Sequence, residues 1–321
     1  MKVRVFYHGK CFDGTASAAV FFRFYRERIR PDAKFQFSGL VHRAGALFNE
    51  SDFDGDENVI VDFKYSPSPR ITWWFDHHQS AFLTPEDAQH YRRGDKKQKF
   101  YDPDCRSCTK LVANVTQEKF GFDPRPVKEL IHWADVIDGA QFKSPEEAVA
   151  MTEPAMKLTM AIESTNDDGF LPTLIPRLAD EPMSRLIEEP FVASLLGPLL
   201  ERHRRSIEIL RERSEYKQGA IYFDITDHDL EGYNKFIPYY LYPDAIYSVG
   251  LSSSSFRVKV AVGSNPWTHE KNMVNLAKVC ERYGGGGHAR VGAISFPPDR
   301  GDEARKAAAD IVRELRASRG G

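Results

Sequence analysis

The 321-residue chain has few of the features that mark secreted, membrane-spanning or duplex-binding proteins. Its four cysteines are too few to hold a chain of this length together by disulfides, so a reducing, cytoplasmic location is expected. No stretch approaches the ~20 apolar residues of a membrane span, and the opening MKVRVFYHGK predicts a strand instead of a signal peptide. A formal net charge of −2 offers no broad basic surface to a long duplex nucleic acid. These absences leave small molecules and short chains as the expected partners.

The cysteine spacing also argues against a structural zinc site. Cys105 and Cys108 form a CxxC pair, but no second Cys or His pair follows at zinc-finger spacing. The composition, 41% hydrophobic and 28% charged, is typical of a globular protein. The length favours two domains over one.

The first half of the chain alternates short apolar strands with helices. Such alternation predicts a parallel sheet with helices on both faces, and in such sheets the ligand binds at the carboxyl ends of the strands. The expected strands are 2–8, 35–40, 58–63 and 71–76, and the expected helices are 14–28, 108–120 and 124–138.

Polar side chains follow three of these strands where each strand ends. His8 ends the first strand, Asp62 the third, and the run Asp76, His77 and His78 the fourth. Because carboxyl ends of parallel strands share one edge of a sheet, these groups are expected to lie together. Carboxylates and imidazoles without a required thiolate suit Mn²⁺ and related divalent metals. A bridging carboxylate could hold two ions ~3.5–4 Å apart, an arrangement that hydrolyses phosphate esters.

The second half has a different pattern. Residues 190–216 predict a long connecting helix, followed by alternating strands, a glycine run and a closing amphipathic helix. We therefore expect an α/β protein with a parallel-sheet N-terminal domain (1–190), a connecting helix (191–216) and a smaller α/β C-terminal domain (217–321).

Five sequence motifs resemble those of one known family. HGKCFDG, VIVDF, FDHH and WADVIDGAQF, in this order and spacing, resemble the four motifs of the DHH phosphoesterase superfamily, and GGGGHARVGAISF resembles the GGGH motif of its associated C-terminal domain. The resemblance implies a catalytic DHH domain, a C-terminal substrate-binding domain and an active-site cleft between them. It also implies two Mn²⁺ ions, for which Mg²⁺ or Co²⁺ could substitute.

The resemblance also assigns roles to residues. The first metal would be held by His8 and Asp62, and the second by Asp13, Asp62 and His77. His78 would face the substrate and assist the leaving group, while Asp76 would orient the imidazoles.

Two positions of the metal site stay open. The fourth motif supplies one further aspartate, which is either Asp135 or Asp138, with Asp138 slightly favoured by the pattern. Cys11 stands where many members have a first-motif Asp, so it either binds the metal as a thiolate or leaves the first site weaker.

The glycine run near the C-terminus is a candidate substrate-binding site. Glycine lets backbone N–H groups approach an anion closely, because no Cβ intervenes. With the family resemblance, this loop and the donors that follow it are expected to bind substrate: Gly285, Gly286, Gly287, His288 and Arg290.

The expected function is therefore hydrolysis. The chain is predicted to be a Mn²⁺-dependent phosphoesterase or phosphodiesterase that uses metal-activated water on small nucleotides or short oligonucleotides. Short RNA, phosphoadenosine phosphate, cyclic dinucleotides, single-stranded DNA and polyphosphate all stay open as substrates. The alternatives are a pyrophosphatase or exopolyphosphatase, or a nucleotide-binding regulatory protein with metal sites weakened by Cys11. A homodimer is left open.

Overall fold

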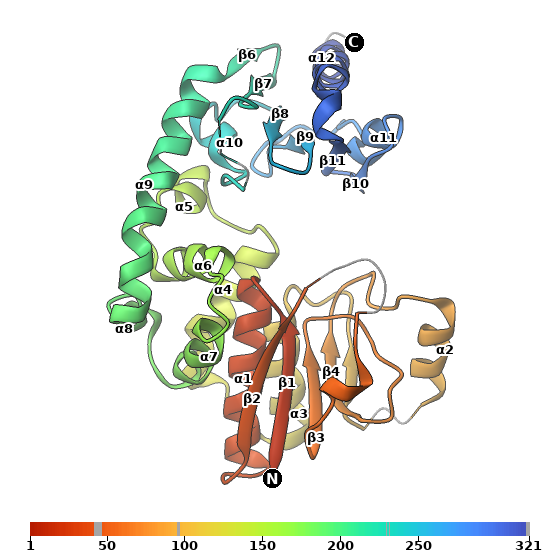
Figure 1. The fold of residues 1–321 in the computed structure, drawn as a ribbon, viewed down its shortest axis with the longest axis vertical. Helices are drawn as coiled ribbons and strands as arrows, with labels where there is room; N and C mark the ends of the chain where they lie inside the picture. Colours follow the sequence, from red (N-terminus) through yellow and green to blue (C-terminus); the bar gives the residue numbers. More distant parts are fainter. Residues whose placement is uncertain (42–46, 95–96, 229, 231, 319–321) are drawn as a thin grey trace. The chain divides into compact units, whose positions relative to one another are not determined.

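The chain folds into two compact units, each described here by itself. The computed structural model describes residues 1–41, 47–94, 97–228, 230 and 232–318. Unit 1 comprises Met1–Phe142 and Thr152–Gly197, and unit 2 comprises Lys143–Met151 and Pro198–Gly321. The long helix α9 (Pro190–Arg213) is labelled in Figure 1. It belongs to unit 1 up to Gly197 and to unit 2 from Pro198. The division into functional domains at 190 and 216 stays a prediction.

Unit 1 is built on a five-stranded parallel sheet, as the alternating pattern predicted. The strand order is β2-β1-β3-β4-β5, and each neighbouring pair is parallel. The strands are β1 (Lys2–His8), β2 (Lys34–Leu40), β3 (Glu57–Val61), β4 (Ile71–Asp76) and β5 (Lys99–Tyr101). The sequence did not predict β5, because three residues are too few to show a strand period.

Helix α1 (Phe12–Arg28) is the central helix of unit 1. Its first half is rich in small residues and buried on all sides, and it packs against α3 (Cys108–Phe120), α4 (Lys128–Asp138) and α7 (Phe170–Asp180). Small side chains permit this close packing. The remaining helices of unit 1 are α2 (Pro85–Arg93), α6 (Pro154–Ser164), α8 (Met183–Leu186) and the 3-10 turns η1 (Glu50–Asp52) and η2 (Arg125–Val127).

Strand β4 carries aromatic side chains on both faces of the sheet. Trp73 packs against Phe21 and Phe24 of α1, whereas Trp74 packs against Tyr65 and Tyr91 on the other face. Both indoles are essentially inaccessible to solvent. This packing fixes the strand that ends in Asp76.

Unit 2 contains a six-stranded mixed sheet in the order β10-β11-β9-β8-β7-β6. Of the pairs in this sheet only β7 with β8 is parallel among the described residues. Helix α12 (Gly301–Ala317) packs on β7, β8 and β9 and closes an aliphatic core. The other elements are α5 (Pro145–Val149), β6 (Glu215–Lys217), β7 (Ala220–Asp224), α10 (Ile237–Leu241), β8 (Tyr247–Ser253), β9 (Val258–Ser264), α11 (Leu276–Glu281), β10 (Gly286–His288), β11 (Val291–Phe296) and η3 (Pro298–Arg300).

Both units thus agree with the predicted α/β class, with a five-stranded parallel N-terminal sheet, a helical middle and a six-stranded mixed C-terminal sheet. Within the described part of the chain, the helices are too short or too polar to cross a membrane.

Candidate metal centre

The carboxyl ends of β1, β3 and β4 bring the predicted acids and imidazoles together. His8 is the last residue of β1, Asp62 follows β3 directly, and Asp76 is the last residue of β4. Since β3 lies between β1 and β4 in a parallel sheet, the three ends meet at one edge. Asp62 and Asp76 are 1% and 0% exposed, so both carboxyl groups are removed from water.

Asp62 lies at the middle of this cluster. Its Oδ2 is 3.6 Å from His8 Nδ1, and its Oδ1 is 3.6 Å from His77 Nε2. The two oxygens of one carboxylate therefore face two different imidazoles. The backbone of Asp62 is in the left-handed region, with φ at 56°, and its N–H donates to the carbonyl of Phe75 at 2.9 Å.

His77 faces three carboxylates through one ring nitrogen. Besides Asp62, its Nε2 lies 3.7 Å from Asp13 Oδ2 and 3.5 Å from Asp138 Oδ2. Its Nδ1 lies 3.0 Å from the carbonyl oxygen of Cys105, which can only accept, so Nδ1 carries a proton and donates it. In the neutral ring, the Nε2 lone pair then points at negative charge. A histidine that binds a metal typically has this second hydrogen bond.

The atoms at the centre of the cluster fit a bound divalent ion. Asp62 Oδ1 and His77 Nε2 are buried without a hydrogen-bond partner among the described residues. Their separation of 3.6 Å is too long for a hydrogen bond, but it is suitable for two ligands of one ion. Unpartnered buried polar atoms each cost about 1–3 kcal/mol. A cation between them removes that cost, so the donor set fits Mn²⁺ and similar ions.

The charges in the cluster shift its ionisation equilibria. Burial lowers the pKa of His77, but the carboxylates of Asp62, Asp13 and Asp138 outweigh it and raise that pKa to about 10. Burial and the neighbouring Asp62 raise the pKa of both Asp13 and Asp138. For Asp62, the three imidazoles outweigh burial and hold its pKa below the usual range. Without a metal, His77 therefore holds its second ring proton at neutral pH.

Asp76 and His78 form a hydrogen-bonded pair at the cluster, and His78 also forms a group of possible metal ligands with Asp62 and His77. Asp76 Oδ1 lies 2.7 Å from His78 Nδ1 and also accepts from the backbone N–H groups of His77 and His78. This bond raises the pKa of His78, while burial raises the pKa of Asp76. Asp76 thus contacts the imidazole of His78 and the backbone of His77, whose ring is held by Cys105 instead.

Asp13 is held by the N-terminus of α3. Its carboxylate accepts from the N–H of Cys108 at 2.7 Å, from the N–H of Thr109 at 3.0 Å and from the Thr109 hydroxyl at 2.6 Å. A helix N-terminus favours negative charge. Sequence reasoning missed Thr109 and the backbone of Cys108, although the segment Ser107-Cys108-Thr109 before a helical pattern could have signalled an N-cap.

The two candidate aspartates of the fourth motif lie in different surroundings. Asp138 forms a group of possible metal ligands with Asp13 and His77. Asp135 instead accepts from the Ser107 hydroxyl at 2.6 Å, and Ser107 Oγ in turn accepts from the N–H of Lys110 as the cap of α3. Among the described residues, Asp138 therefore lies within the cluster, whereas Asp135 is hydrogen-bonded to the N-cap residue of α3.

The predicted substrate residues lie in unit 2. In Gly285 and Gly287 an added Cβ would meet backbone carbonyls of β11 at 2.3 and 2.2 Å, so both glycines are required by the sheet itself. Gly286 faces open space, and His288 and Arg290 are exposed. Arg290 Nη1 lies 2.6 Å from Met273 Sδ. The substrate-binding role of these five residues stays a prediction.

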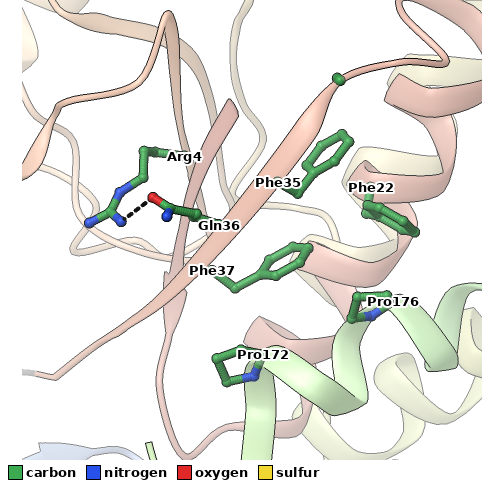
Figure 2. A pocket seen from close by; sticks show the side chains of 8 residues that line it. Arg4, Phe22, Phe35, Gln36, Phe37, Pro172 and Pro176 are labelled. Atoms are coloured by element: carbon green, nitrogen blue, oxygen red, sulfur yellow. Dashed lines mark hydrogen bonds between the residues drawn. The ribbon is translucent and has the colours of Figure 1, made fainter. Parts of the chain in front are cut away.

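A groove elsewhere in unit 1 shares no residue with the cluster. Figure 2 shows phenylalanines of α1 and β2 facing two prolines of α7, with Arg4 donating to Gln36 beside them. The residues around the groove are Arg4, Phe22, Ala33, Phe35, Gln36, Phe37, Pro172 and Pro176. Arg4 is the one charged residue among those that line it.

No family model and no curated protein matches the sequence. Among solved structures, the fold is similar to the pGpG-specific phosphodiesterase PggH from Vibrio cholerae, with a TM-score of 0.70 and 18% identity over 98% of this chain and 100% of that one. An exopolyphosphatase-related protein from Bacteroides fragilis has a TM-score of 0.52 and 13% identity over 100% of this chain and 94% of its own.

RecJ from Thermus thermophilus, solved with Mn²⁺, has a TM-score of 0.52 and 13% identity over 98% of this chain. The match spans 52% of RecJ, about half of its length. These structural neighbours are DHH-family phosphoesterases, so the resemblance predicted from the motifs is confirmed at the level of the fold.

Proposed function

We propose that this chain is a Mn²⁺-dependent phosphodiesterase that hydrolyses short 5′-phosphorylated nucleotides, with the dinucleotide pGpG as the first candidate substrate. The observation that carries the proposal is the position of the Asp62 carboxylate. Its two buried oxygens face separate sets of ligand-type side chains, on a fold shared with a pGpG-specific phosphodiesterase.

The residues divide between two ion positions that share Asp62. His8 and Asp62 would hold the first ion; the second would be held by Asp13, Asp62, His77 and Asp138. When bound, such a pair of ions would supply positive charge to phosphoryl oxygens and lower the pKa of a coordinated water. The chain's own contribution is to hold these ligands rigidly, through the α3 N-terminus for Asp13 and the Cys105 carbonyl for His77.

His78 is suited to act on the leaving group. Its side chain is 37% exposed, against 9% for His77, so substrate could reach it. Its Nδ1 is bonded to Asp76, which leaves Nε2 for the substrate, and the same bond raises the pKa of the ring. A histidine whose pKa is raised is a better-populated proton donor to a departing oxygen than an unperturbed one.

Two observations support a short substrate. The formal charge of −2 over the whole chain gives little attraction for long nucleic acids. PggH is covered over its full length, whereas the match to RecJ spans only half of that exonuclease.

The test is hydrolysis by protein stripped of metal and resupplied with Mn²⁺. The substrates are pGpG, short RNA, phosphoadenosine phosphate, a cyclic dinucleotide, single-stranded DNA, polyphosphate and pyrophosphate, with products separated by chromatography. We expect pGpG to be hydrolysed fastest. Asp62→Asn should lower the rate on the order of 100-fold or more, because one change affects both ions. Asp32→Asn, at an exposed loop position, is the matched control.

The alternatives give different results in the same assay. If polyphosphate or pyrophosphate is hydrolysed fastest, the substrate belongs to that class and is not a dinucleotide. Nucleotide binding without hydrolysis of any substrate, by protein that holds Mn²⁺, would identify a regulatory nucleotide-binding protein and overturn the proposal.

A further inference from the structure

Cys11 brings a sulfur atom into a cluster of oxygens and imidazoles. With His8 and Asp62 it forms a group whose ligand atoms all lie within 4.8 Å of one another. Its Sγ is 3.8 Å from Asp62 Oδ2, the same oxygen that lies 3.6 Å from His8 Nδ1. Among the described residues, this is the group of possible ligands that contains a thiol.

In the metal-free fold the Cys11 thiol donates a long hydrogen bond to Asp62 Oδ2, and it caps no helix. Cys11 occupies the N-cap position of α1, but its side chain makes no capping hydrogen bond. Cys108, also near the cluster, is different, because its buried Sγ lies 3.4 Å from the Phe75 carbonyl and belongs to none of the ligand groups. Cys11 is therefore placed toward Oδ2 of Asp62, a residue that is 1% exposed, while the unpartnered oxygen of Asp62 is Oδ1, on the side of His77.

The distances are suitable for a tetrahedral ion. With a metal–sulfur bond of about 2.3 Å and a metal–oxygen bond of about 2.1 Å, the two ligand atoms lie roughly 3.6 Å apart. For nitrogen and oxygen the corresponding separation is roughly 3.4 Å. The observed 3.8 and 3.6 Å are within a few tenths of an ångström of these values.

The other half of the centre has a harder set of ligands. Asp13, His77 and Asp138 offer only oxygen and nitrogen, and the second oxygen of Asp62 faces His77. Thiolates select zinc-like ions, whereas carboxylates suit Mn²⁺ and Mg²⁺. The two halves therefore differ in the metal that they favour.

We propose that the centre holds two different metals: a zinc-like ion bound by the Cys11 thiolate with His8 and Asp62, and Mn²⁺ bound by Asp13, His77 and Asp138, with Asp62 shared. Binding of the first ion releases the thiol proton to solvent. This inference rests on the proposed function in one respect, because both concern the same metal centre.

Cobalt tests the sulfur ligand directly. Co²⁺ is added to the full-length, metal-free protein, and the near-ultraviolet spectrum is recorded, where thiolate–cobalt charge transfer absorbs. We expect the band in the wild type and in Cys105→Ser, which keeps the Cys105 carbonyl, and its complete loss in Cys11→Ser. A wild type without the band, or Cys11→Ser with it, would overturn the proposal. If Cys11→Ser fails to fold, Cys11→Asp takes its place, and the band should be absent from it as well.

Metal competition tests the division between the two halves. Metal-free protein is mixed with equal concentrations of Zn²⁺ and Mn²⁺, desalted and analysed for both elements. The wild type should retain about one of each per chain, and Cys11→Asp should lower the zinc-to-manganese ratio on the order of tenfold. An equal ratio in the two proteins would contradict the proposal. Neither measurement uses a substrate, so a failure to hydrolyse pGpG leaves both results standing.

Discussion

At the scale of single residues, Asp135 and Asp138 lie in different surroundings, and we expect Asp138 to bind metal directly and Asp135 to support the site. Asp138 faces His77, whereas Asp135 accepts from the cap of α3. We expect Asp138→Asn to weaken Mn²⁺ binding by about 100-fold or more, because it removes a ligand, and Asp135→Asn by about 10-fold, through α3 and Asp13. Equilibrium titration with Mn²⁺ measures both.

Ser107→Ala is the matched control for Asp135→Asn. Since Ser107 joins Asp135 to the helix, both changes should lower the free energy of unfolding by about 0.5–2 kcal/mol, as loss of a helix cap does. If Asp135→Asn abolishes Mn²⁺ binding while Asp138→Asn does not, the fourth-motif ligand is Asp135.

The protonation of His77 predicts how metal affinity depends on pH. In the metal-free protein the pKa of His77 is raised to about 10, so an ion must displace at least one proton at neutral pH. The apparent affinity for Mn²⁺ should therefore weaken by about tenfold for each pH unit below that pKa. Calorimetry between roughly pH 6.5 and 8.5 checks this, and an affinity that does not change across the range would contradict it.

In the metal-free protein, the raised pKa of His77 also determines how its contribution to folding stability changes with pH. The folded-state pKa of His77 lies above the unfolded value, so its contribution is fully present below about pH 6.5. It is lost as the pH rises through about 10.

At the scale of elements, the junction of β1 and α1 depends on a glycine. A Cβ on Gly14 would meet the His8 carbonyl oxygen at 2.3 Å and His8 Cβ at 2.8 Å. Gly14→Ala should therefore push α1 from β1 and lower the free energy of unfolding by about 1–3 kcal/mol. Mn²⁺ affinity should fall as well, because Asp13 and His8 move apart. Denaturant unfolding and metal titration measure the two effects.

Gly197→Ala is the corresponding control within a helix. No atom lies within 4 Å of the added Cβ, and Gly197 is part of α9. This change should be neutral or raise the free energy of unfolding by up to about 1 kcal/mol. Equal destabilisation by both substitutions would show that the close contact at Gly14 is not the cause.

The sequence predicted those parts of the site that depend on strand ends. His8, Asp62 and Asp76 each follow an apolar run, and parallel pairing was enough to bring them together. The N-terminus of α3 could not be predicted as a partner of Asp13, because the two are 95 residues apart and meet only through helix packing. Asp135 and Asp138 share one helix, so only the placement of α4 distinguishes them.

At the scale of the whole molecule, the proposed roles of the two units can be separated by Arg290. If unit 2 binds substrate and takes no part in the chemistry, Arg290→Ala should raise KM much more than it lowers kcat. A charged contact to phosphate is worth roughly 1.5–3 kcal/mol, or about 10- to 150-fold in kcat/KM. Bound manganese should not change. Steady-state kinetics with pGpG and elemental analysis check these expectations.

A small chromogenic phosphodiester distinguishes the two possible roles of Arg290. Such a substrate should be hydrolysed equally by Arg290→Ala and wild type, because it is too small to need a second contact. Arg313→Ala, at an exposed position of α12, is the control for loss of a positive charge. An equal loss on the large and the small substrate would mean that Arg290 acts on the chemical step.

The left-handed backbone at Asp62 restricts which amino acids this position can accept. With φ at 56°, glycine, asparagine and aspartate fit most readily, and β-branched or bulky residues are strained by roughly 1–2 kcal/mol. A codon library at this position, selected only for folded protein, should therefore be enriched in Gly, Asn and Asp. The same library selected for hydrolysis should retain Asp alone. Position 62 is thus limited twice, once by the shape of the chain and once by its chemistry, and the two selections measure each limit separately.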